Sequence, residues 1–182
     1  MSFDQSLFTA VFSLARASSF LDIVGIFFAR YLAYVVFAAF ILFVVLERNW
    51  KKRLYVAVLP LFSVALSYGI VTQLLRFLVD RDRPPIALAL EPLIPMPNSP
   101  AFPSGHAAIF FTLAMALLYL NRRWGIWFFA AAALIAVARV FVGVHWPLDV
   151  VAGAIIGVVS AYAAHRLLPA PVAEKPLSGG AS

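Results

Sequence analysis

The sequence predicts an all-α protein, a polytopic membrane helix bundle of five or six spans with a polar site at the outer membrane-water interface. The first observation is composition: 64% of the 182 residues are hydrophobic and 12% are charged, against about 45–50% and about 25% in soluble domains. The second is that apolar runs of spanning length alternate with short charged loops. The third is that three clusters of ionisable residues fall at one end of these runs. Residues 1–168 are therefore predicted to form a single membrane domain.

The N-terminal stretch is the least regular of the apolar runs. Asp4, Arg16 and Asp22 interrupt it, so residues 1–28 are predicted to form an amphipathic or re-entrant segment. Whether they cross the membrane is left open, which is why the number of spans is five or six.

Five spans are predicted after this segment. They cover residues 29–46, 54–79, 104–120, 125–142 and 146–168. Between the second and third lies a proline-rich stretch, residues 80–103, which cannot be regular helix. A loop of this length in a small protein is usually functional. Residues 169–182, rich in Pro, Gly, Ala and Ser, are predicted to be a disordered tail.

Basic residues predict the orientation, because the side with more Lys and Arg faces the cytoplasm. In the predicted topology one side carries Arg48, Lys51, Lys52, Arg53, Arg122, Arg123, Arg166 and Lys175, and the other carries Arg76, Arg81, Arg83 and Arg139. The smaller group, which includes the ionisable clusters, is therefore placed on the outer face. Topology accounts for the formal charge of +6, and no nucleic-acid partner is predicted. There is no cysteine, which excludes disulfides and thiolate metal sites.

One cluster pairs a histidine with a carboxylate at a helix start. Pro147 suits the first position of a helix, which makes Trp146 the cap and puts Asp149 in the third helical position. From there the carboxylate can accept a hydrogen bond from one ring nitrogen of His145 and leave the other nitrogen as a free lone pair. That arrangement is what a histidine nucleophile needs.

A second cluster, Ser104-Gly105-His106, follows the proline-rich loop. Ser104 occupies a helix-cap position, so the next backbone amides point outwards and form an anion site. Gly105 lets a ligand approach the backbone closely, and His106 can donate a proton to an atom held there. Forked guanidinium groups that suit phosphate oxygens come from Arg76, Arg83 and Arg139. No cluster of carboxylates is present that would hold magnesium or calcium, so neither a metal nor a cofactor is predicted.

Several residues of the outer side also have simpler interpretations. Arg76 and Asp80 could form an ion pair four residues apart on a helix. Asp80, Arg81 and Asp82 are predicted to be solvated loop charges. Arg30 is predicted to extend towards the outer interface, with contact to a second phosphate as the alternative.

Two further interpretations concern His165 and the loop. His165, beside Arg166 near the cytoplasmic end, is predicted to be interfacial. Residues 86–102 are either a surface cover packed on the bundle or the flank of a path for a lipid tail.

The three clusters resemble the signature of the type 2 phosphatidic acid phosphatase superfamily. The motifs of that family run Lys-x6-Arg-Pro, Pro-Ser-Gly-His and Ser-Arg-x5-His-x3-Asp. Here they read Arg76-x6-Arg83-Pro84, Pro103-Ser104-Gly105-His106 and Ala138-Arg139-x5-His145-x3-Asp149. Two positions depart from the pattern. Arg76 replaces lysine, which keeps the charge, and Ala138 replaces serine, which removes a hydroxyl.

The resemblance implies a role for each matching residue. His145 would attack phosphorus to form a phosphohistidine, Asp149 would orient His145, and His106 would protonate the leaving oxygen. The phosphoryl group would be bound by Arg76, Arg83, Ser104, Gly105 and Arg139. Water would then hydrolyse the intermediate.

The size, the outward site and the residues around Leu21 to Leu32 are also similar to bacterial undecaprenyl-diphosphatases of the bacitracin-resistance type. This resemblance implies a multi-pass protein of the bacterial cytoplasmic membrane, with its site facing the periplasm or exterior, that converts undecaprenyl diphosphate to undecaprenyl phosphate. The alternatives are a phosphatidylglycerophosphate or phosphatidic acid phosphatase and, outside the enzymes, a lipid-phosphate binder or small transporter. The expected partners are a lipid phosphate or diphosphate and the bilayer. The sequence predicts no oligomeric state.

Overall fold

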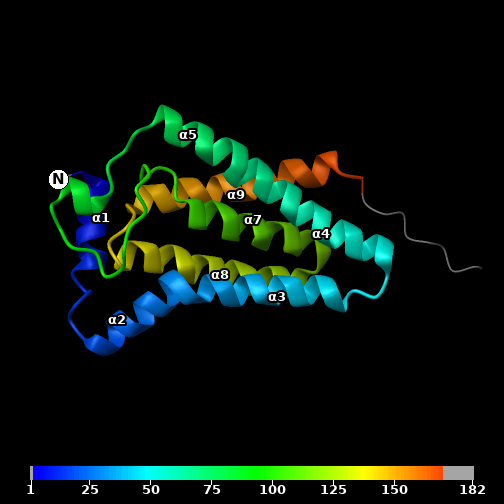
Figure 1. Ribbon diagram of the computed structural model, residues 1–182, viewed down its shortest axis with the longest axis horizontal. Coiled ribbons are helices and arrows are strands. Elements are labelled where there is room, and N and C mark those ends of the chain that lie inside the picture. Colours follow the sequence, from blue (N-terminus) through cyan, green and yellow to red (C-terminus); the bar gives the residue numbers. More distant parts are fainter. Residues whose placement is uncertain (1, 170–182) are drawn as a thin grey trace, which may run out of the picture.

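The computed structural model describes residues 2–169, and within that range it contains helices and loops but no strand. Five long helical rods run side by side along the bundle (Figure 1). In chain order the elements are α1 (Phe3–Phe12), α2 (Ser19–Ile26), the π-helical η1 (Phe27–Tyr31), α3 (Leu32–Leu46), α4 (Trp50–Val64), the π-helical η2 (Ala65–Thr72), α5 (Gln73–Leu78), α6 (Pro84–Ala87), α7 (Gly105–Leu120), α8 (Arg122–Phe141) and α9 (Pro147–Leu167).

The helix lengths confirm the predicted all-α membrane bundle. Four of the rods in the described part of the chain are long and apolar enough to cross a membrane, and the fifth, α7, is a shorter apolar helix of the same bundle. The chain is a multi-pass membrane protein. The predicted disordered tail lies outside the described residues apart from Pro169.

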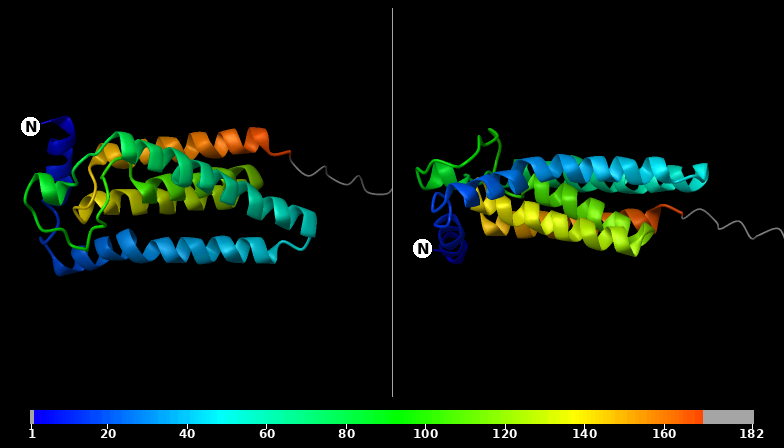
Figure 2. Two further views of the ribbon diagram at one scale, coloured as in Figure 1. Left: turned by 45° about the horizontal axis from the view of Figure 1, so that its top comes forward. Right: turned by 90° about the horizontal axis from the view of Figure 1, so that it is seen from below.

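The N-terminal segment differs from the prediction in where the first spanning helix begins. A continuous helix runs from Ser19 to Leu46 through α2, η1 and α3, so it starts ten residues before the predicted span. Asp22 does not interrupt this helix, because it lies in the first turn, where a carboxylate is favourable, and it accepts a hydrogen bond from the Arg16 N–H at 2.9 Å. Within residues 2–28 only α1 (Phe3–Phe12) is separate from this long helix. It lies across one end of the bundle (Figures 1 and 2).

The proline-rich loop lies at the same end of the bundle as α1 (Figure 1). It contains one helical turn, α6, which begins at Pro84, where the missing N–H of proline costs nothing. Farther along the loop, Ile94 packs in a buried cluster with Ala29, Ala138 and Val142. This part of the loop is therefore packed on the bundle, as the first of the two predicted alternatives requires.

Helix α7 lies at the centre of the bundle and packs against both α8 and α9. Its contact with α9 is close because small residues face it. A Cβ atom added at Gly153 would lie 2.4 Å from the Ser104 carbonyl oxygen, and one at Gly157 would lie 2.6 Å from that of Ala108. Small residues of this kind let membrane helices approach through their backbones. This contact brings the first turns of α7 and α9 together.

Replacing Gly157 by alanine is expected to destabilise the bundle. The added Cβ would meet backbone atoms of α7, which cannot move without separating the two helices. We expect a loss of about 1–3 kcal/mol, the usual cost of overpacking, seen as a lower thermal unfolding midpoint in detergent. The matched control is Gly69→Ala, because a Cβ at Gly69 has no neighbour within 4 Å. Equal midpoints for the two variants would contradict this account of the contact.

Candidate active site

The helix ends that carry the eight predicted site residues lie at the end of the bundle where α1 crosses it (Figure 1). Each of these residues stands at the beginning or end of a helix, so the helix ends set their positions. They are Arg76 in the last turn of α5, Arg83 before α6, Ser104 before α7, Gly105 and His106 in the first turn of α7, Arg139 in the last turn of α8, His145 between α8 and α9, and Asp149 in the first turn of α9.

His145 is 1% exposed, and both of its ring nitrogens have partners. Nε2 lies 3.2 Å from Arg83 Nη1, and Nδ1 lies 3.4 Å from Asp149 Oδ2, which is long for a hydrogen bond. A guanidinium can only donate, so Nε2 is the acceptor and the ring proton is on Nδ1, facing the carboxylate. His145 therefore presents a lone pair on Nε2, as the sequence predicts for a nucleophile.

Burial lowers the pKa of His145 well below its usual range, and the positive charges of Arg83 and Arg139 lower it further. The neutral imidazole is consequently the stable form at neutral pH. This is the protonation state in which Nε2 can attack.

Asp149 is fully buried, and hydrogen bonds fix both oxygens of its carboxylate. Oδ2 accepts from the N–H of Trp146, the predicted cap residue, at 2.9 Å, and Oδ1 accepts from Arg81 Nη1 at 2.7 Å. The backbone oxygen of Asp149 accepts from the Ser104 N–H at 2.9 Å. The first turn of α9 is thus tied directly to the start of α7.

Arg83 is 1% exposed, and its guanidinium is surrounded by acceptors from two loops. Its Nε and Nη1 donate to the backbone oxygens of Ser99 and Val144, both at 2.8 Å, and Nη2 lies near Ser99 Oγ and the Pro100 oxygen. Burial, with Arg76 adding to it, lowers the pKa of Arg83 to about 10, so the group stays charged at neutral pH. Arg83 therefore binds the proline-rich loop beside His145, and of its donors only Nη1 also faces the His145 ring.

Arg76 lies against the start of α7. Its Nη2 donates to the Pro103 oxygen at 3.3 Å, and its guanidinium carbon lies 5.9 Å from the centre of the Tyr68 ring. A Cβ at Gly105 would lie 3.1 Å from this Nη2 and 2.7 Å from the Tyr68 ring, so glycine is needed for the approach. The suggested Arg76–Asp80 ion pair is not among the ion pairs of residues 2–169.

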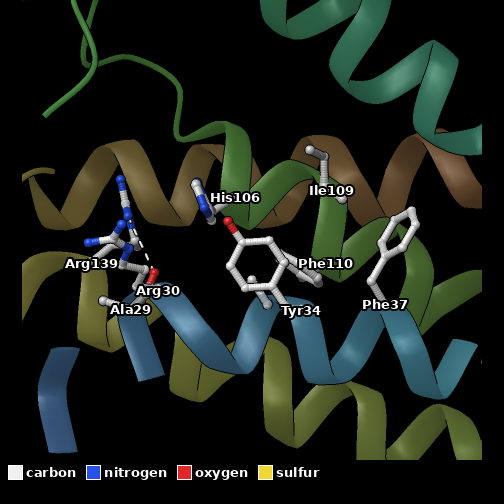
Figure 3. Close-up of a pocket in the computed structure, with 9 residues that line it drawn as sticks. Ala29, Arg30, Tyr34, Phe37, His106, Ile109, Phe110 and Arg139 are labelled. Carbon is white, nitrogen blue, oxygen red and sulfur yellow. Dashed lines mark hydrogen bonds between the residues drawn. The ribbon is translucent and has the colours of Figure 1, made fainter. Parts of the chain in front are cut away.

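His106 and Arg139 line one cavity of about 260 Å³ between α3, α7 and α8. Figure 3 shows Arg30 beside Arg139 and the Tyr34 hydroxyl directed towards His106. Arg139 Nη1 donates to the Ala29 oxygen at 3.3 Å. The remaining lining is mainly apolar and comes from Ala33, Phe37, Ile109 and Phe110. The cavity therefore combines cationic side chains with a mainly apolar wall.

Four buried side-chain atoms in the described residues have no hydrogen-bond partner, and three of them belong to predicted phosphate ligands. These three are Arg76 Nε, Ser104 Oγ and Arg139 Nε, and the fourth is Thr72 Oγ1. Ser104 stands at the cap position, but its hydroxyl makes no cap hydrogen bond. Buried polar atoms are normally satisfied, so three unsatisfied donors at one site fit an anion with several oxygens.

Sequence reasoning missed two residues of this region. Arg81, predicted to be a solvated loop charge, instead bonds to both Asp149 and Asp4, and Asp4 is only 4% exposed. The prediction for Arg81 was wrong because its two partners lie 68 and 77 residues away in the chain. No local spacing could have indicated these pairs.

The predicted interfacial histidine lies apart from this region. His165 lies at the opposite end of α9, where its ring stacks on Tyr119 at 4.0 Å. Within residues 2–169 no group of three or more His, Asp or Glu side chains could hold a metal ion.

Comparison with known families gives a match over most of the chain. The profile of the PAP2 superfamily matches residues 56–172. Undecaprenyl-diphosphatase BcrC of Bacillus subtilis is 29% identical over 157 residues, covering 86% of this chain and 79% of that protein. Lipid A 4'-phosphatase of Bacteroides thetaiotaomicron is 34% identical over 158 residues, covering 78% and 68%.

A shorter match and a solved structure agree with these relatives. Undecaprenyl-diphosphatase of Sulfolobus acidocaldarius is 46% identical over 67 residues, which is 36% of this chain and only 32% of that protein. The crystal structure of Aquifex aeolicus LpxE superposes with a TM-score of 0.73 at 30% identity, covering 91% of this chain and 96% of that one. The similarity in fold therefore extends over nearly the whole chain.

The lowered pKa of His145 predicts how stability changes with pH. Below a pH of about 6.5, His145 takes up a proton in the unfolded chain but not in the folded protein, so protonation favours unfolding as the pH falls. We expect the thermal midpoint of the His145→Gln variant to fall less between pH 7 and pH 5 than that of the unmodified protein. Equal decreases in the two proteins would contradict the buried neutral histidine.

Proposed function

The chain belongs to the PAP2 superfamily, a class of metal-independent lipid phosphatases, and from this premise we propose that it hydrolyses undecaprenyl diphosphate to undecaprenyl phosphate. The observation that carries the proposal is the set of three unsatisfied buried donors, on Arg76, Ser104 and Arg139, gathered at the end of the bundle that holds His145. The reaction is placed at the outer face of a bacterial cytoplasmic membrane, as the distribution of basic residues predicts.

The first step forms a bond between His145 Nε2 and the terminal phosphorus and breaks the phosphoanhydride bond. Asp149 accepts the Nδ1 hydrogen bond and stabilises the positive charge that develops on the ring. Arg83 Nη1, which bonds to Nε2 in the free protein, turns to an oxygen of the transferred group. The cationic side chains neutralise charge on these oxygens, which is the main requirement of phosphoryl transfer.

The leaving group is undecaprenyl phosphate, and His106 gives its proton to the departing oxygen. His106 suits this role because it lines the cavity that also holds Arg139, so that an oxygen bound by the arginine can lie within reach of the imidazole. Water then attacks the phosphohistidine, and phosphate leaves. His106 acts as the base in that second step.

The lipid tail is placed in the apolar part of the same cavity. Phe37, Ile109 and Phe110 line it, and Phe37 on α3 is 46% exposed on the side of the bundle. A tail can therefore lie between α3 and α7 and continue into the bilayer. The proline-rich loop contributes no side chain to this cavity, which favours α3 over the loop as the flank of the tail.

Arg30 favours a diphosphate over a monophosphate substrate. It lines the cavity beside Arg139 (Figure 3), and neither arginine is in an ion pair with a carboxylate of residues 2–169. With Arg76 and Arg83 the site thus gathers four guanidinium groups, more than one transferred phosphoryl group needs. We assign Arg30 to the second phosphate, the alternative to simple extension towards the interface.

Loss of the nucleophile tests the mechanism. The His145→Asn variant is expected to lose roughly 10³–10⁴-fold or more in kcat, the usual consequence of removing the central residue of a catalytic group. Phosphate release by purified protein in detergent with a chelator measures this loss. Full turnover by the His145→Asn variant would contradict the proposed mechanism. Unmodified protein that binds the lipid without turning it over would instead favour a lipid-phosphate binder or a transporter.

A substrate panel tests the choice of lipid. It compares undecaprenyl diphosphate, phosphatidylglycerophosphate, phosphatidic acid and a lipid A phosphate in one detergent. We expect undecaprenyl diphosphate to have the highest kcat/KM. A higher value for phosphatidylglycerophosphate or phosphatidic acid would favour the corresponding phosphatase instead.

Arg30→Gln tests the second phosphate. Losing one charge-assisted hydrogen bond is expected to raise KM for the diphosphate by about 10–100-fold and to leave KM for phosphatidic acid nearly unchanged. Arg30→Lys keeps the charge and serves as the matched control. An equal effect of Arg30→Gln on both substrates would show that the side chain only contacts the interface.

A further inference from the structure

The two carboxylate oxygens of Asp149 have different partners, one facing His145 and the other accepting a hydrogen bond from Arg81. Oδ2 faces His145 Nδ1 and accepts from the Trp146 N–H, whereas Oδ1 accepts from Arg81 Nη1 at 2.7 Å. A carboxylate can rotate about its last bond. Arg81 opposes that rotation from the side away from the histidine.

Arg81 is in turn held by a carboxylate from α1. Its Nη2 donates to Asp4 Oδ2, and the other oxygen of Asp4 accepts from the Leu148 N–H at 2.9 Å. Leu148 immediately precedes Asp149 in the first turn of α9. Asp4 therefore accepts hydrogen bonds both from Arg81 and from the backbone of the turn that carries Asp149.

Aromatic side chains pack around these contacts. The guanidinium carbon of Arg81 lies 5.3 Å from the centre of the Trp146 ring, and Trp146 Nε1 donates to the Asp82 oxygen at 2.8 Å. On α1, Phe8 is 1% exposed and its ring lies 5.1 Å from the ring of Trp146. An arginine set between two buried carboxylates and an aromatic ring has few alternative positions.

We infer that Asp4 and Arg81 are positioning residues for the reaction, which hold the carboxylate of Asp149 turned towards His145. This inference rests on the proposed role of His145 as nucleophile but not on the identity of the lipid. It makes α1 a part of the catalytic machinery, although α1 itself contributes no group that touches the substrate. The competing interpretation is that the two residues only attach α1 to the bundle.

Kinetics of the full-length protein separate the two interpretations. Arg81→Gln and Asp4→Asn are expected to lower kcat by roughly ten- to a hundredfold, the cost of a misplaced catalytic group, with KM changed by less than about twofold because neither side chain reaches the phosphate. Arg81→Lys keeps one charged contact and should recover part of kcat. The substrate is whichever phosphate ester the unmodified protein hydrolyses with dependence on His145, so a wrong lipid would not affect the comparison.

A second arginine offers a matched control for attachment alone. Arg16 ties the same N-terminal segment to Glu91 of the proline-rich loop through a 3.2 Å ion pair, and it has no contact with Asp149. Arg16→Gln should leave kcat unchanged. If it lowers kcat as much as Arg81→Gln does, attachment of the segment is the explanation and the inference is wrong.

The decisive measurement combines variants. If Arg81 acts only through Asp149, Arg81→Gln should cost little further kcat in an Asp149→Asn background, because the group it positions is already lost. Independent structural damage would instead multiply the two losses. Multiplicative losses, or a normal kcat in both Arg81→Gln and Asp4→Asn, would overturn the inference.

Discussion

The close contact between α7 and α9 is the constraint on which the rest of the site depends. The backbones approach because Gly153 and Gly157 face α7 without side chains, and the Ser104 N–H can then bond to the Asp149 oxygen. Dispersion and backbone contacts of this kind hold membrane helices together, since lipid offers no hydrophobic drive for their association. The proposed anion site at the start of α7 and the proposed nucleophile before α9 are brought together by this contact.

Charge balance at this end of the bundle explains how the site can be both stable and ready for an anion. Buried charges are costly unless they are paired. Asp149 and Asp4 share Arg81, and Arg83 is satisfied by loop oxygens and His145. Arg76 and Arg139 keep donors that the protein does not satisfy. The protein thus neutralises its carboxylates and leaves positive charge for a phosphate.

The motif spacing predicts those relations within the candidate site that are local in the chain. His145 lies just before α9 and Asp149 lies on its first turn, so the geometry of a helix start sets their relative position. Ser104, Gly105 and His106 are related in the same local way. Such short-range relations can be read from a sequence because the backbone conformation of a helix start is known in advance.

The two predictions that failed concern charged residues whose partners the sequence does not reveal. They are the prediction of Arg81 as a solvated charge and that of Asp22 as an interruption of the first span. Arg81 is paired with α1 and with the first turn of α9, neither of which adjoins it in the chain. Asp22 is accommodated because the Arg16 N–H meets it at the start of the helix. Side-chain charge alone does not indicate whether a partner will be present.

By itself, the sequence determined the membrane class, the helical composition, the family signature and the eight residues of the candidate site, because hydrophobic length and motif spacing are local properties. Only the tertiary structure decided that Asp4 and Arg81 join the site, that Arg83 is bonded to the loop, and that residues of α3 line the cavity with His106 and Arg139. These features depend on which helix ends meet, and that is set by packing between helices that lie far apart in the chain.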